Sequence, residues 1–536
     1  MKKYIFVTGG VCSSLGKGIA ASSLGSLLEC RGLRIRMIKI DPYINVDAGT
    51  MSPYQHGEVY VTDDGAETDL DLGNYARFTN SPLSREHSIT TGQVYQSVIT
   101  KEREGRYLGR TVQVIPHITD EIKQRIFRIG EAQDADVTLI EVGGTVGDIE
   151  SIPFLEAARQ FSHDVGKKNV VFIHLTLVPE VTGGEMKTKP TQHSVKQLLE
   201  IGIVPDILLC RSTKPLEESM RSKIALFTNV DDEAVISAHD AGSTIYEVPL
   251  NYHAEGLDDI AVAKLGIETR PIDLSEWEKV VNTIIGARHT ERIALVGKYI
   301  DLHDTYKSVH EALYHGGIAN TVKVDIIKID AEELEKTEDL DSLMEGIHGI
   351  LIPGGFGQRG ITGMVKAARY ARQNALPCFG ICLGLQVMVI EYSRNVLEIE
   401  DADSSEFSPD GKNSVVSLLE EQVDVTHYGG TMRLGRSETR LKAGTMIRDI
   451  YGEETIFERH RHRYEVSNRF RPLLEEKGLI ISGVTPDEAL VESIQWPDHP
   501  WGIGVQYHPE FQSKPIKAHP LFTSFIAAAD EVRGRG

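Results

Sequence analysis

The chain has 536 residues, of which 41% are hydrophobic and 25% charged, the usual balance of a globular protein. Its formal net charge of −21 argues against a general nucleic-acid binder, which would be basic. No apolar run approaches the roughly 20 residues that span a bilayer, so we expect neither nucleic acid nor a membrane as a partner. The five cysteines are scattered and form no CxxC pair, which favours a reducing, cytoplasmic location without disulfides or structural zinc.

In the N-terminal half, short apolar runs rich in Val and Ile alternate with helical patterns. Continuous apolar runs are typical of parallel strands that are buried on both faces. The pattern therefore predicts an α/β doubly wound parallel sheet. The runs are YIFVT, IRMIKI, DVTLIEVGG, VVFIHLTLVP, DILLCRS and EAVISA.

A chain of this length predicts two large domains. A helix pattern, DLSEWEKVVNTII, is capped by Ser275 or Asp273 and ends at Gly286. The polar stretch GARHTE follows, and RIALVGKY then opens a second α/β series that includes KVDIIKID, IHGILIPGG, LPCFGICLG and WGIGVQYH. We expect domains over 1–267 and 291–536, joined by a helix and linker over 268–290. The acidic stretch DAEELEKTEDLDSLMEG is typical of a solvated helix face.

The first apolar run leads into a glycine loop, in YIFVTGGVCSSLGKGIAASSLGSLL. The common phosphate loop is G-x-x-x-x-G-K-[ST], in which the final hydroxyl holds Mg²⁺. Here the loop from Gly10 to Gly16 is one residue longer, and Lys17 is followed by Gly18. Strand, loop, lysine and helix start remain, so we predict a P-loop-like anion site. A glycine-rich turn with a surface lysine stays the alternative.

Without that hydroxyl, Mg²⁺ would need carboxylate ligands from elsewhere. Glu141 stands at the end of a predicted strand, where parallel sheets bind ligands. Asp71 lies in AETDLDLGNYARF, where the pattern alone does not separate it from Asp69. Ordinary solvated loop carboxylates are the alternative for both.

The C-terminal half contains a strand, G-x-C-x-G and a helix in LPCFGICLGLQVMVIEY, which predicts a nucleophile elbow at Cys382. The helix start favours a thiolate there, whereas Cys378 lies in the strand and is expected in the core. A later strand ends in VQYHPEF and supplies His508 as a base and Glu510 to orient it. The glycines of LIPGGFG offer N–H groups for an oxyanion hole.

PGGFG, GICLGLQ and YHPE resemble the signature segments of class I (triad) glutamine amidotransferases. The N-terminal half resembles the synthetase domain of the CTP synthase family in FVTGGVCSSLGKGI, KIDPYINVDAGTMSPYQHGEV, DLDLGNYARF, EVGGTVGDIES, GEMKTKPTQHSV and RSKIALF. The resemblance runs nearly end to end, in that family's domain order. It implies ATP-dependent amination of UTP to CTP through a 4-phosphorylated UTP, with ammonia from glutamine.

For the amidotransferase half, the resemblance implies that Cys382 attacks the glutamine amide while His508, oriented by Glu510, moves the proton. Backbone N–H groups of Gly355 and Leu383 would hold the oxyanion, and Arg463 would face the glutamine carboxylate. The implied glutamine-binding residues are Gly355, Leu383, Gly384, Leu385, Gln386, Glu406 and Arg463.

For the synthetase half, the resemblance selects Asp71 and Glu141 as Mg²⁺ ligands. Lys17 and Lys39 are the candidates to clamp the transferring phosphoryl group. The implied ATP-binding residues are Ser14, Leu15, Gly16, Lys17, Gly18, Ile19, Asp71, Asp240 and Ala241. The implied site for UTP, and for CTP as feedback inhibitor, comprises Ser13, Asp148, Ile149, Glu150, Lys187, Thr188, Lys189, Pro190, Thr191, Gln192 and Lys223.

The family also implies a homotetramer, activation by GTP and, in some members, filaments. Two positions depart from its pattern: Cys12 stands where many members have Val, and Thr362 replaces a Glu in the segment GGFGQRGITGM. Arg359 of this segment is retained. In the family this segment is linked to GTP activation, so Thr362 lies where the resemblance implies a regulatory role.

Two other functions fit parts of the pattern. A different ATP-dependent amide-forming ligase, such as a cobyrinic-acid amidase, would share the loop and the elbow but gives no reason for KTKPTQHSV. An ATPase switch with an inactive C-terminal domain would have no need of Cys382, His508 and Glu510. The products of a reaction with UTP, ATP and glutamine separate the three: CTP, another amide, or ADP alone.

Overall fold

The computed structural model describes residues 2–131, 135–300, 302–419 and 431–534. The chain forms two compact units, one made of Met1–Ala48 and Asp71–Asn282 and the other of Gly49–Leu70 and Thr283–Gly536. By packing, residues 49–70 thus belong with the C-terminal half, although the sequence places them inside the N-terminal one. The expected domains over 1–267, 268–290 and 291–536 stay a prediction.

The N-terminal unit is built on a seven-stranded sheet in which every pairing is parallel. All six apolar runs of the sequence form strands, so the predicted doubly wound sheet is confirmed. The strand order is β11 (Val235–His239), β10 (Ile207–Ser212), β7 (Val170–Leu177), β1 (Lys3–Gly9), β6 (Val137–Val142), β2 (Ile35–Asp41) and β5 (Ser88–Thr90).

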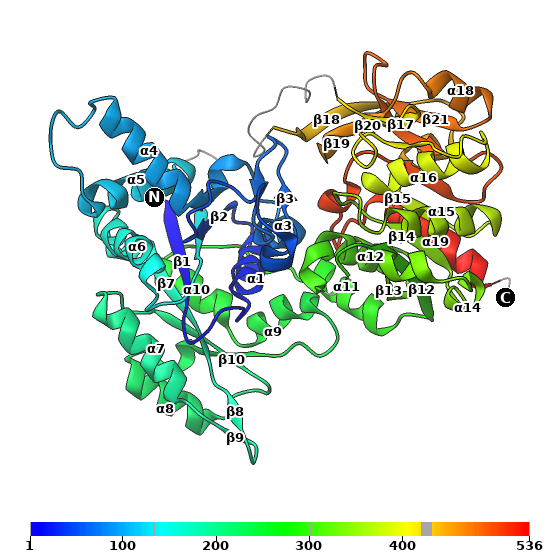
Figure 1. The fold of residues 1–536 in the computed structure, drawn as a ribbon. Coiled ribbons are helices and arrows are strands. Elements are labelled where there is room, and N and C mark those ends of the chain that lie inside the picture. Colours follow the sequence, from blue (N-terminus) through cyan, green and yellow to red (C-terminus); the bar gives the residue numbers. More distant parts are fainter. Residues whose placement is uncertain (1, 132–134, 301, 420–430, 535–536) are drawn as a thin grey trace. The chain divides into compact units, whose positions relative to one another are not determined.

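Helices cover both faces of this sheet (Figure 1). One face carries α1 (Lys17–Cys30), α9 (Val248–Ala254) and α10 (Leu257–Leu265). The other carries α4 (Thr91–Arg103), α5 (Thr119–Gly130), α6 (Ile152–Asp164) and α7 (Lys189–Glu200). The neighbours Ile5 and Phe6 on β1 point to opposite faces and are both fully buried, which explains why the strands read as continuous apolar runs.

The C-terminal unit is built on a nine-stranded mixed sheet. Its parallel part is β13 (Lys323–Asp330), β12 (Thr290–Gly297), β14 (Gly349–Ile352), β15 (Cys378–Ile381) and β23 (Gly502–Val505). Antiparallel strands extend it: β22 (Val491–Gln495), β21 (Ile480–Val484), β18 (Arg433–Leu441) and β19 (Thr455–His462). Helices α15 (Ile361–Gln373) and α16 (Leu383–Asn395) pack on one face, and α12 (Lys307–Asn320) and α19 (Pro520–Arg533) on the other.

Between the two sheets in the sequence, helix α11 spans Ser275–Ile285, as predicted, and Asp273 Oδ1 accepts the N–H of Ser275 at 3.1 Å. The acidic stretch forms two short helices rather than one, α13 (Ala331–Lys336) and α14 (Leu340–Leu343). The side chains of Asp330 and Asp339 each cap a new helix start, which divides the stretch.

None of the helices in the described part of the chain is long and apolar enough to cross a membrane. All five cysteines are free, and Cys378 is buried in β15, as expected for a core residue.

The first turn of α16 packs so closely on β14 that position 384 requires glycine. A Cβ atom at Gly384 would lie 2.1 Å from the carbonyl oxygen of Ile352. We therefore expect Gly384→Ala to push α16 off the sheet and to lower the free energy of unfolding by about 1–3 kcal/mol, measured by denaturant titration. Gly534→Ala is the control, because its Cβ would meet nothing closer than 3.6 Å. Equal unfolding midpoints for the two variants would contradict this packing argument.

Candidate functional site

The glycine loop of the N-terminal unit lies at the carboxyl edge of its sheet, between the end of β1 and the first residue of α1. Ser14 and Gly16 adopt positive φ values of 59° and 89°, so the loop turns sharply before the helix. The Lys17 ammonium donates to the carbonyl oxygen of Gly144, beyond β6, at 2.6 Å. The predicted strand–loop–helix is confirmed, and its lysine reaches the loop that follows β6.

Lys39, Asp71 and Glu141 form one buried cluster at this edge. Lys39 is the register partner of Glu141 across β2 and β6, and its Nζ lies 3.1 Å from Glu141 Oε1. The same Nζ forms an ion pair with Asp71 Oδ2. Tyr75 donates its hydroxyl proton to the second oxygen of Glu141, and Asn74 Nδ2 donates to Asp71 Oδ1 at 3.1 Å.

Burial and the neighbouring charges shift the pKa values of the two carboxylates in opposite directions. Burial, and then the negative charge of Asp71, raise the pKa of Glu141 to about 7 against the opposing effect of Lys39. Burial also acts to raise the pKa of Asp71, but the Lys39 ammonium outweighs it and holds that pKa below its ordinary value. Asp71 and Glu141 offer hard carboxylate oxygens, the ligands that suit Mg²⁺.

The contacts of Gly18 explain why the loop has glycine, and not serine or threonine, after Lys17. A Cβ atom at this position would lie 2.1 Å from Asp71 Oδ1. The serine or threonine of the common phosphate loop would therefore collide with the aspartate. The protein places a carboxylate where related loops place a hydroxyl.

The segments expected to bind pyrimidine nucleotide also gather near this edge. A Cβ at Gly10 would lie 1.7 Å from Ser194 Oγ, and one at Gly147 would lie 2.8 Å from Gln197 Nε2. The glycine loop and the loop that leads to Asp148, Ile149 and Glu150 thus both lie against α7. The first turn of this helix carries Lys189, Pro190, Thr191 and Gln192.

Three other expected nucleotide residues have charged neighbours in the structure. Lys187 forms an ion pair with Glu185 at 2.5 Å and lowers the pKa of this carboxyl. The positive charge of the exposed Lys223 on α8 (Glu218–Thr228) lowers the same pKa further. Asp240, just after β11, pairs with Arg211 at 2.5 Å. Their roles in binding stay predictions.

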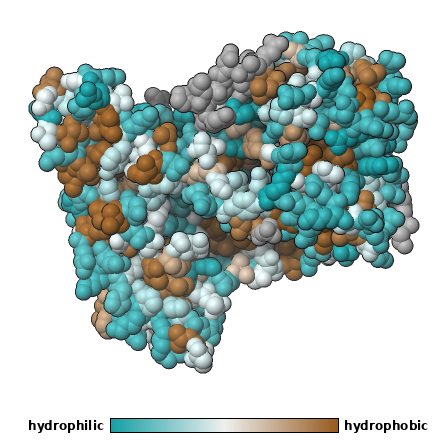
Figure 2. Space-filling model, in the orientation of Figure 1, coloured by the Kyte–Doolittle hydropathy of each residue, from teal (hydrophilic) through white to brown (hydrophobic). Residues whose placement is uncertain are grey.

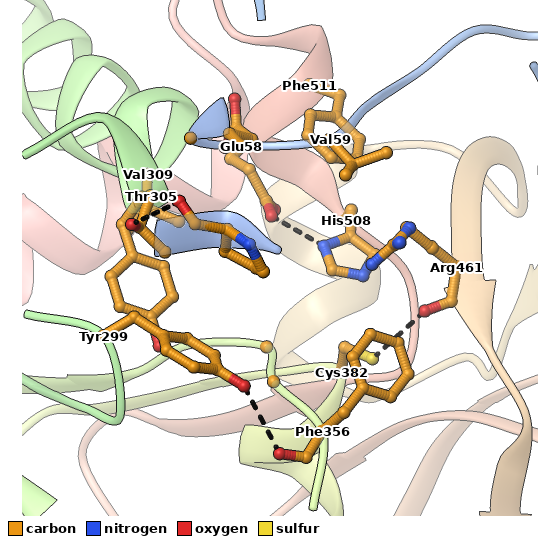
Figure 3. A pocket seen from close by; sticks show the side chains of 16 residues that line it. Glu58, Val59, Tyr299, Thr305, Val309, Phe356, Cys382, Arg461, His508 and Phe511 are labelled. Carbon is orange, nitrogen blue, oxygen red and sulfur yellow. Dashed lines mark hydrogen bonds and ion pairs between the residues drawn. The ribbon is translucent and has the colours of Figure 1, made fainter. Parts of the chain in front are cut away.

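In the C-terminal unit, Cys382 stands at the turn between β15 and α16 with a positive φ of 53°, as a nucleophile elbow requires. His508 follows β23, and its Nδ1 lies 2.7 Å from Glu510 Oε1. Cys382, His508 and Glu510 line one pocket together with Gly355. Figure 3 shows Cys382 and His508 in this pocket. The predicted nucleophile, base and orienting carboxylate are thus brought together.

His508 is held in its charged form. Its burial would lower its pKa, but Glu510 and then the Cys382 thiolate raise this pKa to about 10. With Nδ1 engaged by Glu510, Nε2 is the nitrogen left for Cys382, and it is buried with no hydrogen-bond partner among the described residues. A charged imidazole beside a cysteine favours the thiolate and has a proton ready for a leaving amine.

The pocket has walls that the sequence analysis missed. Residues 49–70 contribute Glu58 and Val59, and Tyr299 and Arg461 come from elsewhere in the unit. Arg461 pairs with Glu67 at 2.8 Å and lies over the Phe356 ring. The alternation R-H-R-H-R in RHRHRYEV could have indicated Arg461, because a strand sends alternate residues to one face.

Of the expected glutamine-binding residues, some lie at the pocket and others lie behind or outside it. Glu406 accepts the N–H of Gly357 at 2.7 Å, in the segment LIPGGFG of the C-terminal unit. Burial raises the pKa of Glu406. Gln386 is buried behind the pocket, and Leu385 is fully buried in the core, so only its backbone could contact glutamine. Arg463 donates to Thr431 Oγ1 at 3.1 Å. It is not one of the described residues that line the pocket.

Comparison with known proteins identifies the family of both halves of the chain. The family model described as CTP synthase N-terminus matches residues 3–267, and the one described as glutamine amidotransferase class-I matches residues 301–528. The CTP synthase of Carboxydothermus hydrogenoformans is 58% identical over 530 residues, which cover 99% of each chain.

The CTP synthase of Geobacter sulfurreducens is 59% identical over 529 residues, 98% of each chain. A solved structure of the Trypanosoma brucei CTPS glutaminase domain with bound acivicin is 41% identical and covers 45% of this chain and 94% of that one, with a TM-score of 0.42. The two family models and the relatives of full length show that this chain belongs to the CTP synthase family.

Proposed function

We propose that this protein converts UTP to CTP, with ATP to activate the pyrimidine and glutamine to supply the ammonia. The observation that carries the proposal is the presence in one chain of a thiol–imidazole–carboxylate site and a lysine–carboxylate site beside a phosphate loop. Each half of the chain matches the corresponding half of the CTP synthase family.

In the C-terminal unit, the Cys382 thiolate attacks the side-chain carbonyl carbon of glutamine. Backbone N–H groups of Gly355 and Leu383 stabilise the oxyanion, as preorganised donors do in acyl transfer. As the carbon–nitrogen bond breaks, His508 gives its proton to the leaving nitrogen, so ammonia departs and a thioester remains. Water activated by His508 then hydrolyses the thioester to glutamate and restores Cys382.

In the N-terminal unit, the 4-oxygen of UTP attacks the terminal phosphorus of ATP, and the bond to ADP breaks. Lys17 and Lys39 stabilise the charge of the transferring phosphoryl group. Mg²⁺ held by Asp71 and Glu141 would add positive charge there. Ammonia then adds to carbon 4, and phosphate leaves with the former carbonyl oxygen to give CTP. Glutamine is needed because free ammonia is mostly protonated near neutral pH.

Regulation and assembly belong to the same proposal. CTP would act as inhibitor through the UTP site and GTP as activator, with Thr362 in place of the usual glutamate. Exposed apolar side chains in the N-terminal unit support a homotetramer: Leu108, Ile149 and Leu226 are 87%, 82% and 81% exposed. Figure 2 shows hydrophobic patches over this unit. The cytoplasmic location and filament formation stay predictions.

Replacing the nucleophile should separate the two activities. We expect Cys382→Ala to abolish CTP formation from glutamine but to keep CTP formation from added ammonium, because the N-terminal site uses ammonia itself. The measurement is CTP produced from UTP and ATP with each nitrogen source. Cys378→Ala, a change at the core cysteine on the strand that precedes Cys382, serves as the control and should keep both activities. A loss of the ammonium reaction in Cys382→Ala would contradict the assignment.

Removing a carboxylate from the lysine–carboxylate site should stop CTP formation and leave glutamine hydrolysis intact. Asp71→Asn is expected to lower CTP formation from both nitrogen sources by about 10²-fold or more, because phosphoryl transfer loses its cation site. Glutamate release from glutamine should continue. The control is Asp136→Asn, which removes an ion-paired aspartate next to the opposite end of β6. Normal CTP synthesis by Asp71→Asn would rule out its role.

The carboxylate partner of His508 should matter for both rate and stability. Glu510→Gln is expected to reduce kcat/KM for glutamine by roughly 10²-fold to 10⁴-fold, since the imidazole loses its orienting charge. The pKa of about 10 exceeds the ordinary value of 6.5, so the charged pair stabilises the fold fully below about pH 6.5 and loses this effect as the pH rises through about 10. Thermal unfolding should therefore show a deficit for the variant at neutral pH that fades near pH 10. A deficit that does not change with pH would contradict the charged pair.

A further inference from the structure

A fully buried glutamine that neither the motifs nor the proposed mechanism uses lies against the nucleophile. Gln506 directly follows β23, and its Nε2 lies 3.7 Å from Cys382 Sγ. The register of β15 and β23 pairs Ile381 with Val505, so Cys382 and Gln506 are the next residues on neighbouring strands.

Backbone bonds hold both members of this contact in place. The N–H of Cys382 donates to the carbonyl of Val505 at 2.7 Å. The N–H of Gln506 donates to the carbonyl of Glu492, on the next strand, at 2.9 Å. These bonds fix the backbones of both residues, so the two side chains start from neighbouring, fixed points of the sheet.

A chain of hydrogen bonds decides which end of the Gln506 amide faces the sulfur. It begins at the carbonyl oxygen of Tyr464, which can only accept, so the Gln386 group 3.0 Å from it must be the NH₂. The other N–H of this NH₂ donates to Gln506 Oε1 at 3.3 Å. Turning either amide over would set two acceptors or two donors against each other. The NH₂ of Gln506 is therefore the end that faces Cys382.

We propose that Gln506 stabilises the Cys382 thiolate by donating an N–H to its sulfur, and that Gln386 is a positioning residue that fixes the orientation of the Gln506 amide. An N–H donor favours the anion over the thiol, because hydrogen bonds to charged groups are the stronger ones. This role rests on the proposed glutaminase reaction and adds a third group to the imidazole and the helix start that favour the thiolate.

Other groups around the nucleophile also influence its charge and must stay constant in a test. The titratable or charged residues that line the same pocket are His508, Glu510, Arg461, Glu58, Tyr299 and Tyr306. Replacing the Gln506 amide leaves all of them in place, so a change in the pH profile reports the loss of the N–H donor.

The test is Gln506→Met in the full chain, which keeps the length of the side chain and removes the donor. We expect kcat/KM for glutamine to fall about 10-fold or more and the acid limb of its pH profile to move up by about one pH unit, since the thiol holds its proton longer. Alkylation of Cys382 by iodoacetamide, followed by mass spectrometry of its peptide, should slow near pH 6.5 and approach the wild-type rate near pH 9.5. CTP formation from ammonium should stay within about twofold of wild type.

Two further variants separate this role from a structural one. Gln495→Met removes a buried amide on neighbouring β22, and its pH profile and alkylation should match wild type. Gln506→Glu has nearly the same shape but places a carboxylate beside the sulfur, so it should be more impaired than Gln506→Met at neutral pH. It also provides the measurement if the methionine variant does not fold.

The inference would be overturned if the Gln506 variants had the acid limb at the same pH as wild type and were alkylated at the same rate. The proposed function would survive that result. If instead the wild-type enzyme made no CTP from glutamine, the proposed function itself would fail.

Discussion

Both candidate sites depend on the register of parallel strands. Pairing β2 with β6 sets Lys39 opposite Glu141, and pairing β15 with β23 sets the residue before Cys382 opposite the residue before Gln506. Parallel strands end at a common edge, so residues that are far apart in the chain meet there as the sheet forms. A shift by one residue would send each of these side chains to the opposite face.

The two sites use buried charge in opposite ways. At the carboxyl edge of the first sheet, Lys39 pairs with Asp71 and Glu141, Lys17 acts on both, and burial raises the pKa of Glu141 to about 7. Buried carboxylates are costly in a folded protein unless cations lie beside them. At the cysteine site, Glu510 keeps the buried His508 positively charged, which favours an anionic sulfur nearby. The first arrangement is suited to a metal and phosphate, and the second to a nucleophile and a leaving amine.

The two faces of strand β19 have different roles: one packs in the core and the other holds the wall of the cysteine pocket. His460 and His462 are buried on one side, while Arg459 and Arg461 on the other side bind Asp63 and Glu67 of the 49–70 segment. These ion pairs fasten the segment over the cysteine pocket, where Glu58 and Val59 become part of the wall. A stretch read as part of the N-terminal half thus completes a site in the C-terminal unit.

The amino-acid sequence by itself determined the strands of the first sheet, the glycine loop, the elbow at Cys382 and the pair His508 and Glu510, because hydrophobic patterns and turn residues act over short distances. It left Asp71 and Asp69 equivalent until the family resemblance chose Asp71, which the structure sets against Lys39. Only the tertiary structure decided that Gly18 makes room for Asp71, that residues 49–70 line the cysteine pocket, and that Gln506 faces the sulfur. Each of these contacts joins residues distant in the chain through strand register and packing, which no local pattern records.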